Sequence, residues 1–104
     1  MKKFFCFKFH IFLTFSKGKG FKKLLEEIKG SDQGVCKGLG GSQHLYFKNF
    51  YSNGIQGGIV PVASGMALAE KLKGNNSMAV CFLGDGTMGE GIIYESFNMA
   101  SLWS

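Results

Sequence analysis

A turn with the character of a metal–phosphate site lies in the last quarter of the chain. Gly84-Asp85-Gly86-Thr87 follows the apolar run 78–83 and precedes a segment with helical character. Ligands of open parallel sheets bind at the carboxyl ends of the strands, and glycines let a ligand approach the backbone closely. The first N–H groups of the following helix, together with its dipole, would attract an anion.

The aspartate in this turn indicates which kind of anion site it is. A carboxylate repels a phosphate unless a divalent cation lies between them, and proteins often bind Mg²⁺ through one or two carboxylates plus ligand phosphates. The Thr87 hydroxyl adds a hydrogen-bonding group beside Asp85. We therefore predict a metal–diphosphate site with Asp85 as a Mg²⁺ ligand. The alternative is a tight turn in which Asp85 caps the helix.

The segments around the turn predict an α/β domain with a parallel sheet. The continuous apolar run 78–83 is typical of a strand buried on both faces. A helix is predicted over 60–73, with Pro61 in its first turn and Gly74 at its end, and a second helix over 90–103. The order helix, strand, turn, helix is the order found in α/β sheets.

Upstream, a short helix is predicted over 21–29, because its apolar residues recur at helical spacing and its lysines and glutamates occupy the other face. Residues 30–58 show no sustained period and are rich in glycine, which predicts a long functional loop. No partner strand for 78–83 is evident upstream, and the sequence stops after the second helix. We therefore expect a fold that is truncated after this helix.

Composition excludes several classes of protein. Hydrophobic residues make up 45% and charged residues 18% of the 104 residues, which favours a globular domain over a disordered tail or a membrane protein. The first 16 residues resemble a signal peptide, but Lys8 and His10 interrupt the apolar stretch and no cleavage site follows. We expect neither secretion nor membrane insertion. The three cysteines lack the spacing of a zinc site or a disulfide framework.

The net charge of +5 allows a basic nucleic-acid-binding module as another interpretation. Arginine is absent, however, although arginine usually supplies bidentate recognition of phosphate and guanine. A solvated lysine-rich surface is therefore preferred, and no nucleic-acid partner is expected.

Several separated blocks of the sequence resemble one family, in one order and with nearly the family's spacing. The blocks are Gly38-Leu39-Gly40-Gly41-Ser42-Gln43-His44-Leu45-Tyr46, Lys48-Asn49-Phe50-Tyr51, Asn53-Gly54-Ile55-Gln56-Gly57, Gly84-Asp85-Gly86-Thr87-Met88-Gly89-Glu90-Gly91 and Tyr94-Glu95-Ser96-Phe97-Asn98-Met99-Ala100-Ser101-Leu102-Trp103. Together they resemble the α subunit of thiamine-diphosphate-dependent 2-oxo acid dehydrogenases, the E1 component, of the pyruvate or acetoin type. The resemblance covers residues 21–104, whereas 1–20 form a divergent aromatic and basic segment.

The resemblance implies a partial thiamine-diphosphate-binding fold and a set of cofactor contacts. In this family Asp85 would bind Mg²⁺, and Gly86 and Thr87 would contact the cofactor at its diphosphate end. The carbonyl of Gly54 and the N–H of Gln56 would hold the aminopyrimidine ring. The position of Phe47 lines the cofactor pocket.

The family's reaction is the oxidative decarboxylation of a 2-oxo acid, with acyl transfer to lipoyl groups. The thiazolium carbon of the cofactor is the nucleophile, while the protein supplies orientation and electrostatics. The implied partners are an E1 β subunit, which contributes the glutamate that activates the aminopyrimidine, and a lipoyl acyltransferase, the E2 component. No catalytic acid or base is assigned within this chain. The implied location is the bacterial cytoplasm or the mitochondrial matrix.

Two departures from the family leave alternatives open. The Asn that completes the Mg²⁺ shell in relatives would lie beyond Ser104, and the region 6–10 does not match the basic residue that grips the diphosphate. Acetoin cleavage is the alternative activity within the family. From another class, the chain could be a non-catalytic remnant that associates with an E1 partner.

Overall fold

The computed structural model describes residues 3–6 and 19–103. Of the signal-like stretch 1–16, only residues 3–6 are described, and Lys8 and His10 lie outside the described residues. The chain divides into two compact units. The β4 unit contains β1 and the described residues from Ile55 onward, and the hairpin unit contains the described residues 19–54. Each unit is described by itself.

The β4 unit contains two strands, two α-helices and a 3-10 helix. The elements are β1 (Lys3–Cys6), α3 (Ile59–Leu72), β4 (Met78–Cys81), the 3-10 helix η1 (Asp85–Gly89) and α4 (Gly91–Leu102). The predicted helices and strand are thus confirmed, within two residues at each end. Together with the helix of the hairpin unit, they give the chain the α/β character expected from its sequence.

Strand β1 is the partner of β4 that sequence reasoning missed. The two strands run parallel, with Lys3 opposite Met78 and Cys6 opposite Cys81. The expectation that no upstream segment pairs with β4 was therefore wrong. The cause is local: β1 is only four residues long and belongs to the aromatic and basic start of the chain, where no strand period stands out.

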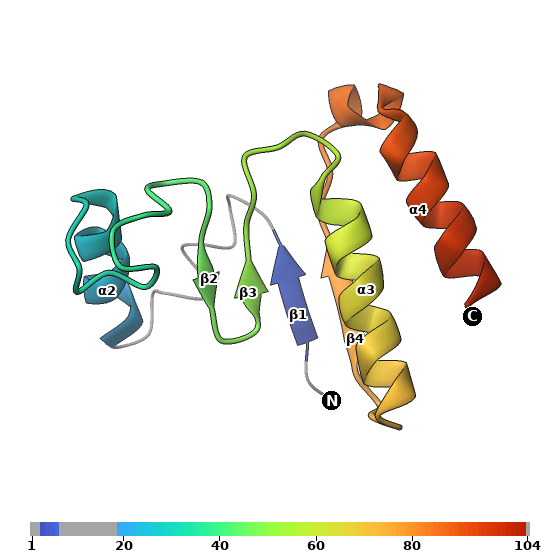
Figure 1. Ribbon diagram of the computed structural model, residues 1–104, viewed down its shortest axis with the longest axis horizontal. Helices are drawn as coiled ribbons and strands as arrows, with labels where there is room; N and C mark the ends of the chain where they lie inside the picture. The colour runs from blue at the N-terminus through green and yellow to red at the C-terminus, as the bar shows by residue number, and fades with distance from the viewer. Residues whose placement is uncertain (1–2, 7–18, 104) are drawn as a thin grey trace. The chain divides into compact units, whose positions relative to one another are not determined.

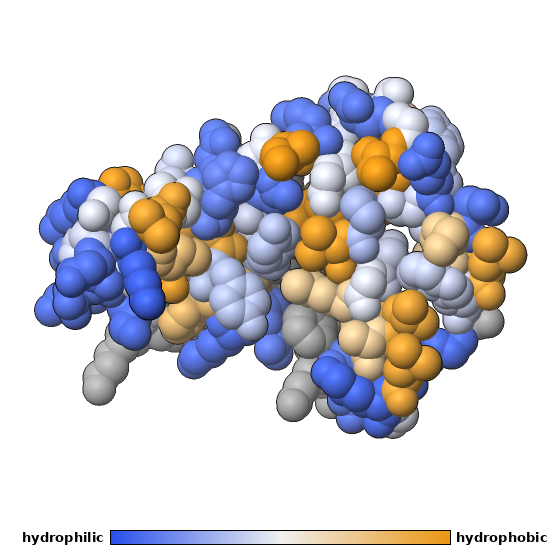
Figure 2. Space-filling view, viewed as in Figure 1, coloured by the Kyte–Doolittle hydropathy of each residue, from blue (hydrophilic) through white to orange (hydrophobic). Residues whose placement is uncertain are grey.

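Helix α3 packs on β4, and α4 packs on α3 (Figure 1). Gly74, with φ +68°, ends α3 as the stop signals predicted, because glycine adopts this conformation without strain. The core of this unit contains Ile59, Val60 and Ile93, and Ile93 is fully buried. Figure 2 shows hydrophobic side chains at the surface over α3 and α4. Leu102 of α4 is 72% exposed.

Strand β4 is less buried than its apolar sequence predicts. Its residues are half-buried, and Met78 is 45% exposed. The prediction of a strand buried on both faces was therefore wrong for the described part of the chain. A continuous apolar run identifies a strand, but the packing around it decides how far each face is covered. Of the described helices, none has the length and hydropathy needed to cross a bilayer.

The hairpin unit begins with α2 (Lys19–Ile28), as the helical spacing predicted. Gly30, with φ +76°, ends the helix, and Ser31 N donates to Glu26 O in the pattern of a C-terminal cap. One expectation fails here. Glu27 was placed on the solvent face with the other charged residues, yet it is fully buried.

The glycine-rich segment 30–58 is not a plain loop. It contains the antiparallel hairpin β2 (Tyr46–Phe47) and β3 (Phe50–Tyr51). Backbone bonds between Leu45 and Ser52, in both directions, extend the pairing beyond the strands. The prediction of a loop without regular elements was wrong, because two-residue strands are too short to produce a period in the sequence.

The buried side chain of Leu45 stabilises the hairpin unit. Leu45 is 1% exposed, whereas Leu39 is 89% exposed. We expect Leu45→Ala to lower the free energy of unfolding by about 2–5 kcal/mol, because the truncation leaves a cavity in a packed core. Leu39→Ala is the matched control and should change the free energy by no more than about 0.5 kcal/mol. Urea denaturation measures both; equal effects would contradict this core assignment.

Candidate functional site

The predicted Gly84–Thr87 turn lies at the carboxyl end of β4. Gly84 is extended, with φ −76° and ψ 149°, and η1 begins at the next residue. Helix α4 starts only at Gly91. This start agrees with the prediction of a helix over 90–103, whereas the 3-10 helix between Gly84 and α4 was not predicted. The dipole of α4 begins several residues beyond Gly86, because the turn itself closes as a short 3-10 helix.

Asp85 does not cap the helix. The cap position of η1 is Gly84, which makes no side-chain capping bond, and Asp85 is the first residue inside the helix. Its carboxylate is exposed and has no hydrogen-bond or ion-pair partner among residues 3–6 and 19–103. The capping alternative is thus not supported. An exposed carboxylate at a strand end remains available to a cation.

The two glycines of the turn leave open space around the backbone. A Cβ built on Gly86 meets no atom within 4 Å, and one built on Gly84 meets only Thr87 Oγ1, at 3.7 Å. Protein packing therefore does not require glycine at either position. The bare backbone instead leaves room for a bound group, as a cofactor-binding turn needs.

Thr87 connects the turn to a segment far away in the sequence. It is 8% exposed, and its hydroxyl donates a 2.6 Å hydrogen bond to Gln56 Oε1. The structure thus brings together two of the residues singled out from the sequence, both within the β4 unit. In this arrangement the hydroxyl proton of Thr87 is donated to Gln56. The backbone N–H of Gln56 has no acceptor in the described part of the chain.

Gly57 holds the same segment against the start of α4. Gly57 is buried and has φ +71°, which favours glycine. A Cβ at this position would lie 2.8 Å from Ile92 Cγ2 and 3.2 Å from Glu90 Cβ. The backbone at Gln56 and Gly57 is therefore fixed from two sides, by the Thr87 hydroxyl and by the packing of α4.

Phe47 and Gly54 belong to the hairpin unit. Phe47 is half-buried in β2, and the ammonium of Lys48 lies 5.3 Å from its ring centroid. Gly54 is exposed, and a Cβ there would lie 3.2 Å from His44 Nε2 and closer still to Gln43 Oε1. Gly54 is therefore a glycine because of contacts inside its own unit.

Glu27 is the residue that sequence reasoning missed in the hairpin unit. Its carboxylate accepts backbone N–H bonds from Cys36 at 2.7 Å, Gly38 at 2.9 Å and Gly40 at 2.7 Å. Burial alone would raise the pKa of Glu27, but these bonds outweigh it and hold the pKa below the usual value of 4.5. The sequence carried one weak signal, the helical spacing of Glu27 with the buried Leu24.

An apolar cavity in the β4 unit lies away from the turn. It has a volume of about 350 Å³ and is lined by α3, β4 and α4, including Ala67, Cys81 and Phe97. Burial raises the pKa of the Cys81 thiol, so this group stays protonated at neutral pH. No residue of the Gly84–Thr87 turn lines the cavity, and none of its described lining residues carries a carboxylate.

The described residues contain no cluster of three or more His, Cys, Asp and Glu side chains suited to a metal ion. A structural zinc site needs such a cluster. Mg²⁺ bound to a ligand diphosphate does not, since phosphate oxygens and waters supply most of its coordination shell. Asp85 therefore fits a Mg²⁺–diphosphate site better than a structural zinc site.

Comparison with known proteins identifies one family. Residues 4–104 match the family described as "Dehydrogenase E1 component". The human mitochondrial pyruvate dehydrogenase E1 component subunit alpha, somatic form, is 45% identical over 91 residues, which cover 86% of this chain and 23% of that protein. The bovine somatic form gives the same values. The human testis-specific form is 46% identical over 92 residues, or 88% of this chain and 24% of that protein.

The match extends upstream of the motifs, because it begins at residue 4, inside β1. The chain spans about a quarter of the length of these relatives.

The Thr87–Gln56 hydrogen bond is testable by a double-mutant cycle. Thr87→Val and Gln56→Leu each remove one partner, and we expect a coupling free energy of about 0.5–1 kcal/mol in urea unfolding. Thr87→Ser keeps the hydroxyl and serves as the matched control. A coupling energy near zero would mean that the bond does not hold the two segments together.

The lowered pKa of Glu27 predicts an acid-sensitive hairpin unit. Because the folded pKa lies below the unfolded one, ionised Glu27 stabilises the fold above 4.5, and this contribution is lost as the pH falls through the folded pKa. We expect the difference in free energy of unfolding between wild type and Glu27→Gln to narrow as the pH falls below 4.5. Urea denaturation across this range measures it. A difference independent of pH would contradict an ionised Glu27 in the folded chain.

Proposed function

Since the chain belongs to the dehydrogenase E1 component family, we propose that it is part of a thiamine-diphosphate-dependent α subunit that decarboxylates a 2-oxo acid. The relatives named above are pyruvate dehydrogenase subunits, which favours pyruvate as the substrate. The proposal includes the fold: the parallel strands β1 and β4, with α3 packed on β4, form part of a thiamine-diphosphate-binding domain.

One observation carries the proposal within this chain. Asp85 presents an exposed carboxylate beside two bare glycine backbones, at the carboxyl end of a strand that pairs in parallel. The carboxylate neither caps η1 nor has an ion-pair partner among the described residues. Such a carboxylate at a phosphate-accessible strand end suits Mg²⁺ bound to a diphosphate.

Each residue has a separate role in this proposal. Asp85 binds Mg²⁺, and the Gly86 and Thr87 backbone faces the diphosphate end of the cofactor. The Gln56 N–H and the Gly54 carbonyl hold the aminopyrimidine ring, and Phe47 lines the pocket. When bound, thiamine diphosphate supplies the nucleophilic carbon that adds to the 2-oxo acid.

The protein's own contribution is to position and orient the cofactor. Asp85 and the Gln56 N–H would contact opposite ends of the same molecule. The 2.6 Å bond from Thr87 to Gln56 joins the segments that carry these two groups, and Gly57 seats one of them against α4. Preorganisation of this kind lowers the entropic cost of placing a cofactor for reaction.

The remaining groups come from partners. We propose that an E1 β subunit supplies the glutamate that activates the aminopyrimidine, and that a lipoyl acyltransferase accepts the acyl group. The mitochondrial names of the relatives favour the mitochondrial matrix as the location in a eukaryote.

The metal assignment is tested with the two aspartates of the chain. We expect Asp85→Asn to weaken binding of thiamine diphosphate with Mg²⁺ at least about tenfold, because a charge-assisted metal ligand is lost. Asp32→Asn is the control, because Asp32 is equally exposed but lies in the hairpin unit. Isothermal titration calorimetry, with and without an E1 β subunit, measures the binding. Unchanged binding by Asp85→Asn would overturn the metal assignment, and no binding by wild type in either case would overturn the proposed cofactor.

A further inference from the structure

A charged carboxylate lies buried inside the hairpin unit. Glu27 has no exposed surface, and no lysine pairs with it among the described residues. Burying a lone charge is costly unless hydrogen bonds replace its hydration. Here the backbone N–H groups of Cys36, Gly38 and Gly40 supply these bonds. An interaction of this kind fixes the backbone that donates to it.

The donors come from one glycine-rich segment that wraps around the carboxylate. Oε2 accepts from Cys36 and Gly38, and Oε1 accepts from Gly40. Lys37 and Gly38 have positive φ, at +58° and +75°, which turns successive N–H groups toward one point. The segment thus forms an anion-binding nest that this chain fills with its own side chain.

Glycine is required where the segment comes closest. A Cβ on Gly34 would overlap the Glu27 carboxylate and lie 2.6 Å from Glu27 Cα. A Cβ on Gly40 would overlap the carbonyl oxygen of His44. The loop therefore has little freedom to shift around the carboxylate.

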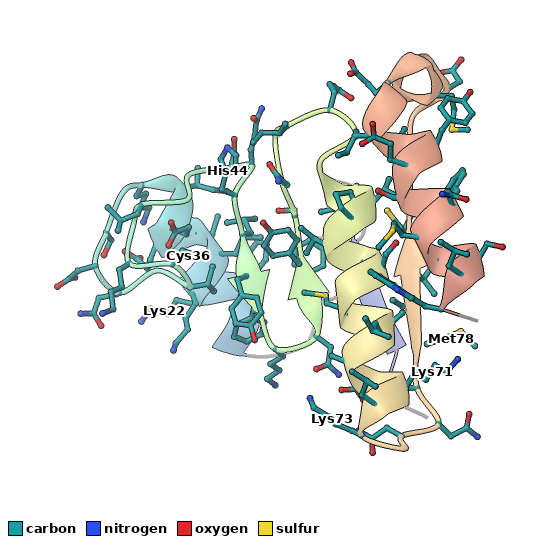
Figure 3. The ribbon with its side chains drawn as sticks, turned by 45° about the vertical axis from the view of Figure 1, so that its right-hand side comes forward. Lys22, Cys36, His44, Lys71, Lys73 and Met78 are labelled. Atoms are coloured by element: carbon teal, nitrogen blue, oxygen red, sulfur yellow. The ribbon has the colours of Figure 1, made fainter. Side chains whose placement is uncertain are left out.

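The constraint continues from the loop to Gly54. The carbonyl of Gly40, whose N–H is held by Glu27, accepts the His44 N–H at 3.0 Å. His44 lies at the end of the loop, just before β2 (Figure 3). The Gln43 carbonyl accepts a hydrogen bond from the Ser52 hydroxyl at 2.7 Å, which ties the same corner to the residue that follows β3.

The side chains of this corner lie against Gly54. A Cβ on Gly54 would overlap Gln43 Oε1 and lie 3.2 Å from His44 Nε2. A chain of contacts therefore runs from Glu27 through Gly40 and His44 to Gly54. Every member lies within the hairpin unit.

We infer that Glu27 is a positioning residue, whose carboxylate sets the Cys36–Gly41 backbone and so holds the His44 imidazole and the Gln43 amide against Gly54. The last step, that this arrangement supports binding of the aminopyrimidine ring at Gly54, rests on the proposed function. Glu27 itself touches neither the cofactor nor the substrate.

Glu27→Gln tests the inference, with Glu26→Gln as a matched control. The amide keeps the shape of the side chain, but it loses the charge and replaces one acceptor oxygen with a donor. Glu26 is the preceding residue in α2, and among the described residues its side chain pairs only with the exposed Lys29. The first readout is NMR of the chain: amide exchange at Gly40 and His44, and the ring signals of His44. The second is the affinity for thiamine diphosphate with Mg²⁺ in the presence of an E1 β subunit.

We expect Glu27→Gln to speed amide exchange at Gly40 and His44 about tenfold or more, to shift the His44 ring signals, and to weaken cofactor binding about tenfold. Glu26→Gln should change none of these. Glu27→Asp keeps the charge on a shorter side chain and should shift the His44 signals less. Glu27→Asp also serves as the test variant if Glu27→Gln does not fold.

The outcomes separate this inference from the proposed function. Unchanged exchange and unchanged His44 signals in the Glu27 variants would overturn the positioning role. Altered His44 signals with unchanged cofactor affinity would overturn the link to the cofactor and leave a purely structural glutamate. If wild type binds no thiamine diphosphate, the proposed function fails, and the NMR readout alone decides whether Glu27 positions His44.

Discussion

The hairpin unit depends on one interaction, the ionised carboxylate of Glu27 inside a nest of backbone N–H groups. A buried charge without hydrogen bonds would destabilise the fold, so Glu27 and the segment 36–40 must adopt their positions together. This requirement explains why three positions are glycine. A Cβ at Gly34 or Gly40 would clash with neighbouring atoms, and Gly38 has a positive φ. The glycines that made the segment look like a plain loop are what allow it to enclose the carboxylate.

In the β4 unit, side-chain contacts fix two segments that are distant in the sequence, around Gln56 and Thr87, beside the exposed carboxylate of Asp85. The Thr87–Gln56 hydrogen bond joins the segment before α3 to the turn after β4. The contact of Gly57 with α4 fixes the first of these segments further. Asp85 and Gly86 are left without such support, and open space surrounds Gly86. Rigid surroundings and an open turn are the combination that a preorganised cofactor site requires.

The sequence alone gave the helices, the β4 strand and the family resemblance. Helical spacing, a proline in the first turn and glycine stops are local signals, so α2, α3 and α4 could be located without tertiary information. The short partners β1, β2 and β3 were missed, because four or fewer residues produce no period. The 3-10 helix after Gly84 was also missed, since a Gly-Asp-Gly-Thr turn is compatible with either kind of helix.

The sequence by itself therefore located a carboxylate in a glycine turn after a strand, and it showed the family resemblance through motifs that occur in order. Tertiary structure decided which charged residue is buried and which polar groups are already used. Glu26 and Glu27 are neighbours of the same type, yet only Glu27 faces the nest. The physical reason is that burial and hydrogen bonding depend on segments distant in the sequence, as for Thr87 and Gln56, and no local pattern encodes such contacts.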